Sequence, residues 1–270
     1  MKNIFIIAII SIIAIASVSA QEKQWSLEAG GGYVLPFAQG VSYTTYSPTT
    51  PAYSYFTGNT TGLGNYGWEV DGKAGYALST DLDLLINTSY LNGNATFTDT
   101  FYIGSRSFGD TYRANWSSLR FAAGLRYTFL KIDSWSFFGG TGPLLVLPSD
   151  LVVNISDNYD SFTATDTITY SPGIGAYGEL VAEYRANDSF GISLTLAFDK
   201  VSVAVTKEKV TDSTGASTTK TYTSNPTVNT SNQTASDLSS STSSSKYYTY
   251  PARYVDLSDF GVTVGLVGHF

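Results

Sequence analysis

Ionisable side chains recur at alternate positions in several segments of this 270-residue chain. In "WEVDGKA" (68–74), an extended backbone would place Glu69, Asp71 and Lys73 on one face and the apolar residues on the other. Acids and bases on neighbouring strands can pair across one face of a sheet. We therefore predict one interior charge network, which consists of Glu28, Glu69, Asp71, Lys73, Arg120, Arg126, Glu179 and Glu183, with Asp199 on the same face.

Residues suited to catalysis are few. The chain has one histidine, His269, and no cysteine, whereas a general base near neutral pH is most often histidine and structural zinc needs Cys or His ligands. A carboxylate-only site of Asp157, Asp160 and Asp166 is an alternative, although acidic loop residues are more often simply solvated. We predict no enzyme activity, no catalytic residue, no cofactor and no metal site.

The first twenty residues, "MKNIFIIAIISIIAIASVSA", contain one charge, Lys2, then an apolar run and a small-residue end. This order is typical of a secretory signal peptide. We predict cleavage after Ala20 and a single mature domain over 21–270. A membrane anchor is the alternative, but the run is short for a span of about 20 residues. Because 22 acidic residues outnumber 15 basic ones, we predict no nucleic-acid partner.

Eight segments alternate apolar and polar residues with a period of two, which indicates β-strands. The links after the second, fourth and sixth are about three or four residues long. Short turns on one side and long loops on the other are typical of outer-membrane barrels. The prediction is an all-β, eight-stranded antiparallel up-and-down transmembrane β-barrel with short periplasmic turns. Its expected strands are 25–35, 66–78, 82–91, 117–129, 135–147, 173–184, 190–201 and 259–270, and its four long surface loops are 36–65, 92–116, 148–172 and 202–253.

Aromatic residues fall near both ends of these segments, where rings prefer the membrane interface. We predict an inner girdle of Trp25, Tyr76, Phe129, Trp135, Tyr184, Phe190 and Phe270. We predict an outer girdle of Tyr33, Tyr66, Trp68, Tyr90, Phe198 and Phe260. The alternative is that the same rings form the core of a soluble sandwich.

The last strand ends in alternate apolar residues and a terminal aromatic: Phe260, Val262, Val264, Leu266 and Phe270. This pattern resembles the C-terminal assembly signal of bacterial outer-membrane proteins. The resemblance implies recognition by the barrel-assembly machinery and a place in the bacterial outer membrane. In architecture the mature chain is similar to small OmpA/OmpX-type barrels, which implies a lumen blocked by ion pairs.

Three functions remain open from the sequence. The first is a monomeric structural or surface-interaction protein in outer-membrane lipid, whose Ser-, Thr- and Tyr-rich loops contact an extracellular ligand or form a variable coat. The second is a narrow channel or carrier for small solutes, with the charge network as its gate. The third is a soluble lipocalin-like barrel, which would turn its apolar faces inward.

Overall fold

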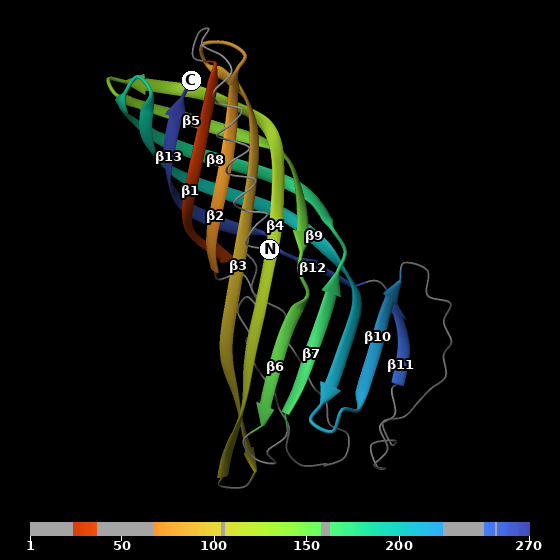
Figure 1. The fold of residues 1–270 in the computed structure, drawn as a ribbon. Coiled ribbons are helices and arrows are strands. Elements are labelled where there is room, and N and C mark those ends of the chain that lie inside the picture. The colour runs from red at the N-terminus through yellow and green to blue at the C-terminus, as the bar shows by residue number, and fades with distance from the viewer. Residues whose placement is uncertain (1–23, 37–66, 104–105, 158–162, 224–245, 252) are drawn as a thin grey trace.

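The computed structural model describes residues 24–36, 67–103, 106–157, 163–223, 246–251 and 253–270. The predicted signal peptide and the predicted loop 36–65 fall almost entirely outside these ranges. All regular elements in the described part are β-strands, and they belong to one sheet (Figure 1). Among the described residues, no helix is long and apolar enough to cross a membrane.

Eight strands form a closed antiparallel ring. Neighbours in the chain pair with each other around most of the ring, and it closes because β1 pairs with β13 and β8 with β9. Closure leaves no unpaired edge in the ring. The predicted eight-stranded barrel is therefore confirmed. In ring order the strands are β1 (Trp25–Pro36), β2 (Gly67–Ala77), β3 (Leu82–Ile103), β4 (Arg106–Ile132), β5 (Trp135–Pro148), β8 (Gly173–Asn187), β9 (Phe190–Asp212) and β13 (Asp259–His269).

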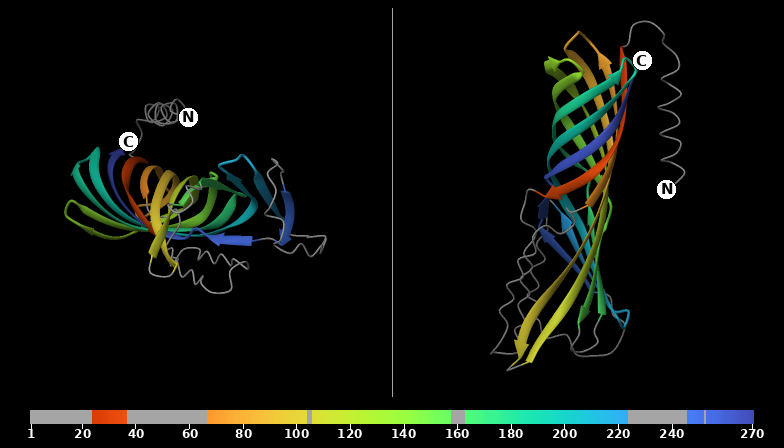
Figure 2. Two further views of the ribbon diagram at one scale, coloured as in Figure 1. Left: turned by 90° about the horizontal axis from the view of Figure 1, so that it is seen from below. Right: turned by 90° about the vertical axis from the view of Figure 1, so that its left-hand side faces the viewer.

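Beyond the ring, β3, β4 and β9 continue into a curved wall that we call the extension (Figure 2). There β6 joins β4, β7 joins β6 to β9, and β10 pairs with the other side of β9. The chain terminus at β13 lies at the opposite end of the molecule (Figure 1). The added strands are β6 (Leu151–Asp157), β7 (Thr163–Tyr170), β10 (Ser217–Thr223), β11 (Lys246–Pro251) and β12 (Arg253–Asp256).

Three of the predicted long loops are not irregular but contain β-strands. Segments 92–116, 148–172 and 202–253, predicted as irregular loops, contain the strands of the extension. Their Ser- and Thr-rich sequences lack the apolar alternation that identified the barrel strands. Threonine and tyrosine nevertheless favour extended structure, and pairing with the long strands β4 and β9 satisfies their backbone groups.

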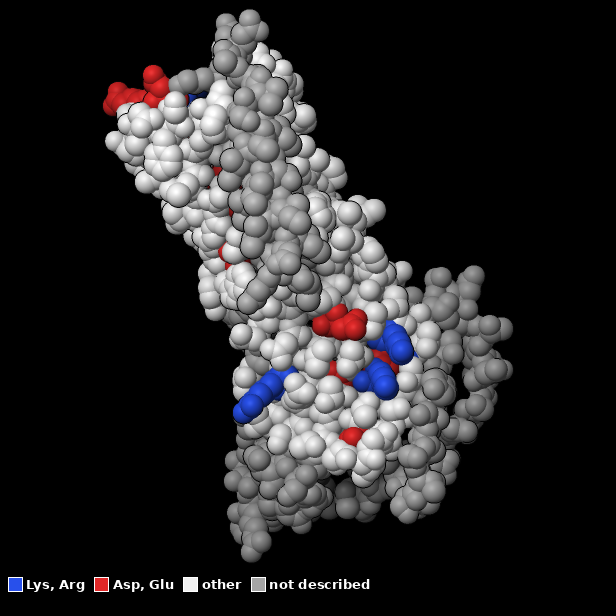
Figure 3. All heavy atoms as spheres, viewed as in Figure 1, with Lys and Arg blue, Asp and Glu red and all other residues white. Residues whose placement is uncertain are grey.

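In the barrel the apolar side chains face outward. Ile86, Leu125, Leu194 and Val264 are about half exposed, although each lies in the middle of a strand. The outer surface of the barrel in Figure 3 accordingly shows almost no charge, whereas charged groups gather over the extension and at the short-turn end. A soluble lipocalin-like barrel would have the reverse arrangement, so the structure does not support that alternative.

The faces exchange polarity along single strands. On β9, Leu194 faces outward and Thr195 inward within the barrel, but beyond Asp199 the inward residues are Val201 and Val203. On β4, the change falls between Trp116, which is buried with the valines, and Arg120. The barrel therefore has an apolar exterior and a polar interior, and the extension has a polar exterior and an apolar inner face.

Two glycines allow β4 and β5 to approach closely. A Cβ at Gly124 would lie 2.1 Å from the carbonyl oxygen of Thr141, and one at Gly142 would lie 2.1 Å from that of Ala123. Both glycines are on the interior face. Only a residue without a side chain fits such a bend, which is a usual role of glycine at barrel corners.

Candidate functional site

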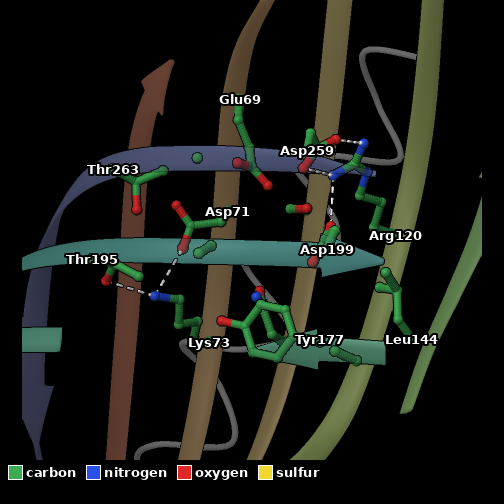
Figure 4. Close-up of a pocket in the computed structure, with 15 residues that line it drawn as sticks. Glu69, Asp71, Lys73, Arg120, Leu144, Tyr177, Thr195, Asp199, Asp259 and Thr263 are labelled. Atoms are coloured by element: carbon green, nitrogen blue, oxygen red, sulfur yellow. Dashed lines mark hydrogen bonds and ion pairs between the residues drawn. The ribbon is translucent and has the colours of Figure 1, made fainter. Parts of the chain in front are cut away.

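All eight residues of the predicted charge network are buried on the interior face of the barrel. They come from β1, β2, β4 and β8, and Asp199 of β9 joins them. Figure 4 shows part of the set converging on the lumen from several strands. The structure does not bring them into one network, however, but divides them into separate groups along the barrel.

The group nearest the extension is centred on Arg120. Its guanidinium donates to Asp199 at 2.6 Å and to both carboxylate oxygens of Asp259, at 3.0 and 2.5 Å. The Nε atom donates to Ser118 at 3.2 Å. A buried guanidinium with two carboxylates has its directional donors satisfied, which is the condition for such a charge to be tolerated.

The middle group is centred on Lys73. Its ammonium lies 3.3 Å from Glu28 and from Glu179, 3.6 Å from Asp71 and 2.9 Å from the Thr195 hydroxyl. One cation therefore faces three buried carboxylates. Glu28 also accepts a hydrogen bond from Ser193 at 2.6 Å, and Glu179 accepts one from the Tyr177 hydroxyl.

Two further groups lie toward the short-turn end. Arg126 donates to Asp83 at 2.9 and 3.2 Å and lies over the ring of Phe138 with 4.7 Å to the centroid. Glu183 is 2.8 Å from the ring of His269. It is also 3.0 Å from Arg185, whose side chain is half exposed.

Glycines on neighbouring strands make room for these side chains. A Cβ at Gly30 would lie 2.6 Å from the carboxylate of Asp71, one at Gly265 would lie 2.7 Å from that of Glu28, and one at Gly75 would lie 2.9 Å from the guanidinium of Arg126. The high glycine content on the inward face thus gives a narrow barrel the space for long ionic side chains.

Sequence reasoning omitted Asp259, Asp83 and Tyr177. Asp259 directly precedes Phe260, the first residue of the apolar alternation predicted for the last strand. Tyr177 has the same parity as Glu179, so alternation along β8 places both on the interior face. That alternation was the signal that could have found it.

A small cavity lies between the Arg120 and Lys73 groups. The volume open to a water molecule is about 10 Å³. Two cations, Lys73 and Arg120, line it, together with four carboxylates: Glu69, Asp71, Asp199 and Asp259. The described side chains therefore fill most of the lumen at this level, as expected for eight strands, and leave room for about one water molecule.

The carboxylate-only alternative lies only partly within the described residues and stays a prediction. Asp166 is buried on β7, and Asp157 ends β6, while Asp160 lies outside the described ranges. In the described part of the chain, no group of three His, Asp or Glu residues is placed to hold a metal ion.

The residues of the predicted assembly signal lie on the outer face of the last strand. Val264 and Leu266 are more than half exposed, and the backbone of Phe270 bonds to that of Trp25 at 2.9 and 3.1 Å. Phe260 contacts Phe198, with ring centroids 5.2 Å apart. Their recognition by the assembly machinery stays a prediction.

Cross-strand aromatic pairs mark both ends of the apolar band. At the short-turn end, Trp25 packs against Tyr76 and Trp135 against Tyr184 with tilted rings, whose centroids are 4.8 and 5.2 Å apart. At the other end, Trp68 pairs with a second ring, Tyr90, at 5.7 Å. Of the predicted outer girdle, Tyr66 lies outside the described residues.

A closed ring of eight antiparallel strands, with an apolar exterior and an ionic interior, defines a transmembrane β-barrel. No family model and no curated protein matches the chain. Among solved structures, it is similar to outer membrane protein OprG from Pseudomonas aeruginosa, with a TM-score of 0.49, 12% identity, and coverage of 92% of this chain and 97% of that one. It is also similar to the outer membrane protease OmpT from Escherichia coli, with a TM-score of 0.32, 10% identity, and coverage of 92% and 94%.

Proposed function

We propose that this protein is a monomeric outer-membrane barrel with a closed lumen, which holds the extension in the medium outside the cell as a surface for interaction. The observation that carries the proposal is the exchange of polarity along β4 and β9. Outward-facing apolar side chains such as Leu194 are concentrated on the barrel, whereas outward residues of the extension such as Ser202 and Asn154 are polar, so lipid surrounds the barrel and water surrounds the extension.

The apolar band has a height that fits a bilayer. On β1 and β2, the pair Trp25 and Tyr76 lies eight residues from the pair Tyr33 and Trp68. Eight residues span about 27 Å along a strand, or about 21 Å along the axis at a tilt of about 40°, against a band of about 25 Å in outer-membrane barrels. The aromatic pairs therefore lie at the two interfaces.

The outer face of the extension supplies the surface. Arg113, Asn154, Thr165 and Thr211 lie side by side in one cross-strand row of β4, β6, β7 and β9. They line a groove of about 620 Å³ whose other side chains are mostly hydroxyls. Hydroxyl, amide and guanidinium groups suit a polar extracellular ligand that presents hydrogen-bonding groups.

The proposal assigns no catalytic role. The one histidine of the chain, His269, which is the residue type most often used as a general base near neutral pH, lies at the short-turn end of the barrel, where it contacts Glu183. That position is far along the strands from the extension, where an extracellular substrate would arrive.

Topology can be tested by labelling, because the chain has no cysteine of its own. Ser202 is exposed at the start of the extension, and Thr80 is exposed in a short turn. On intact cells, a membrane-impermeant maleimide should label the Ser202→Cys variant and should label Thr80→Cys only after the outer membrane is opened. The reverse pattern would invert the topology, and labelling of neither variant on opened cells would contradict the exposure of both sites.

A channel for small solutes is the second candidate, because a water-sized cavity separates the two main ion-pair groups. Single-channel recording of the purified protein in a planar bilayer distinguishes the two. Background conductance supports the closed barrel. Stepwise openings that disappear when the charges of the Arg120 group are removed together would support the channel.

A further inference from the structure

The cavity in the lumen has a surplus of hydrogen-bond acceptors. Four buried oxygens of its lining accept no hydrogen bond: both carboxylate oxygens of Asp71, Oδ1 of Asn87 and Oδ1 of Asp199. Asp71 is 5% exposed and lies on the wall of the cavity (Figure 4). A buried acceptor without a donor costs free energy, and an unpaired buried carboxylate costs much more.

The cations of the lining are already engaged. Arg120 is shared between Asp199 and Asp259. The ammonium of Lys73 donates to Glu28 and to Thr195, and its distance of 3.6 Å from Asp71 is too long for a hydrogen bond. Glu69 and Asp71 are therefore the lining carboxylates to which these two cations donate no hydrogen bond, and both oxygens of Asp71 are buried without any other donor.

The lining of the cavity is also negatively charged overall. Four carboxylates against two cations give a formal charge of −2 around the cavity. Glu28 and Glu179, which contact Lys73 from the other side, add two more negative charges. A water molecule can donate hydrogen bonds to the free oxygens, but it leaves this charge uncompensated in a barrel surrounded by lipid.

We propose that this cavity, which has the unpaired oxygens of Asp71, Asn87 and Asp199 in its lining, binds one small monovalent inorganic cation of the class of sodium, potassium and ammonium. The cavity volume of about 10 Å³ is about that needed for one water-sized occupant. Divalent ions bind through six or more oxygens with several carboxylates, and in the described part no group of three His, Asp or Glu side chains is placed to hold a metal ion. Organic cations such as choline are too large.

The test uses the full mature chain folded in detergent micelles, with its tryptophans as the fluorescent probe of unfolding. We measure the urea midpoint as sodium, potassium or ammonium chloride replaces choline chloride at constant ionic strength. A ligand that binds only the folded state raises stability by RT ln(1 + [L]/Kd). The midpoint should therefore rise by equal steps for each tenfold increase of at least one small cation above its Kd, and it should not rise with choline.

Matched variants locate the site. Asp71→Asn should lose the cation-dependent rise, whereas Asp83→Asn, the same chemical change beside Arg126, should keep it. Asn87→Asp adds a charge without removing an acceptor, so it should lower the Kd and shift the onset of the rise to a lower cation concentration. This variant also provides a test if Asp71→Asn does not fold.

Two results would overturn the proposal. The first is an equal midpoint in choline and in all three small cations, or an equal rise in the wild type, Asp71→Asn and Asn87→Asp. The second is a midpoint that changes with pH but not with any cation, which would assign the surplus negative charge to a bound proton. The broadening of the ²³Na resonance by the wild type, and its loss in Asp71→Asn, would support the site directly.

Discussion

The barrel and the extension share the strands β3, β4 and β9, but the polarity of their faces is opposite: the outer face is apolar in the barrel and polar in the extension. Within the barrel, the outer face of β9 carries Ile192 and Leu194. In the extension, the same face of β9 carries Ser202. The strand geometry does not change at this level, so the surroundings decide which face is apolar. The level of the exchange therefore marks the end of the apolar outer surface that faces lipid.

The two regions are also held together differently. The barrel interior depends on buried ion pairs in small groups, whereas the inner face of the extension packs apolar residues such as Trp116, Leu151 and Val203. Among the described residues, the extension includes the ion pair of Glu208 with Lys220 at 2.5 Å, and the Tyr222 hydroxyl donates to Glu208 at 2.7 Å. Substitutions that test charge should therefore act most strongly in the barrel.

The largest effect is expected at Arg120. The Arg120→Met variant leaves Asp199 and Asp259 buried without their cation, and removal of one partner of a buried ion pair costs about 3–5 kcal/mol. Urea unfolding in lipid vesicles measures the loss. The triple variant with Asp199→Asn and Asp259→Asn should recover much of it, and a triple variant as unstable as the single one would contradict the ion-pair account.

A lipid-facing charge is the next largest change. Leu125 is half exposed on β4, between the aromatic levels, and an arginine at mid-membrane costs about 2–4 kcal/mol. The Leu125→Arg variant should lose that much stability in vesicles. Asn154→Arg makes a similar change on the exposed outer face of the extension and should remain within about 0.5 kcal/mol of wild type. Equal costs at the two sites would remove the distinction between the regions.

The close approach of β4 and β5 gives a smaller effect. In Gly124→Ala, the new methyl would meet the Thr141 carbonyl oxygen at 2.1 Å, and overpacking of this kind costs about 1–3 kcal/mol. Gly178→Ala is the matched control, because its nearest atom is 3.8 Å away. The difference between their urea midpoints measures the cost, and equal midpoints would show that the bend relaxes freely.

Alternation in the sequence was sufficient to predict the barrel and its interior. Glu69, Asp71 and Lys73 fall on one face because strand geometry has a period of two, and this remains true whatever the neighbours are. Which acid pairs with which base could not be predicted, since it depends on strand register and tilt. Thus Glu28 and Lys73 meet across β1 and β2, but Arg120 meets Asp259 across the lumen.

The extension was predicted least well. Residues 163–170 and 217–223 form β7 and β10, yet their polar sequences resemble loops. A strand with water on one face and a neighbouring strand at each edge needs few apolar residues. Pairing with the long strand β9 determines that β7 and β10 are extended. The sequence pattern of one chain segment does not show which strand it will pair with.

The smallest effect is expected at the short-turn end, where Lys131 donates to Asp81 at 2.9 Å and both side chains are half exposed. The hydrogen bond from Lys131 lowers the pKa of Asp81 below its ordinary value of about 3.9. A lowered pKa in the folded state stabilises the protein above the ordinary pKa, and the stabilisation disappears as the pH falls through the folded-state value. The urea midpoint of wild type should therefore exceed that of Lys131→Met slightly at pH 6, and the two should converge as the pH falls below the lowered pKa of Asp81. A difference as large as that of Arg120→Met would show that this turn, and not the lumen, holds the barrel closed.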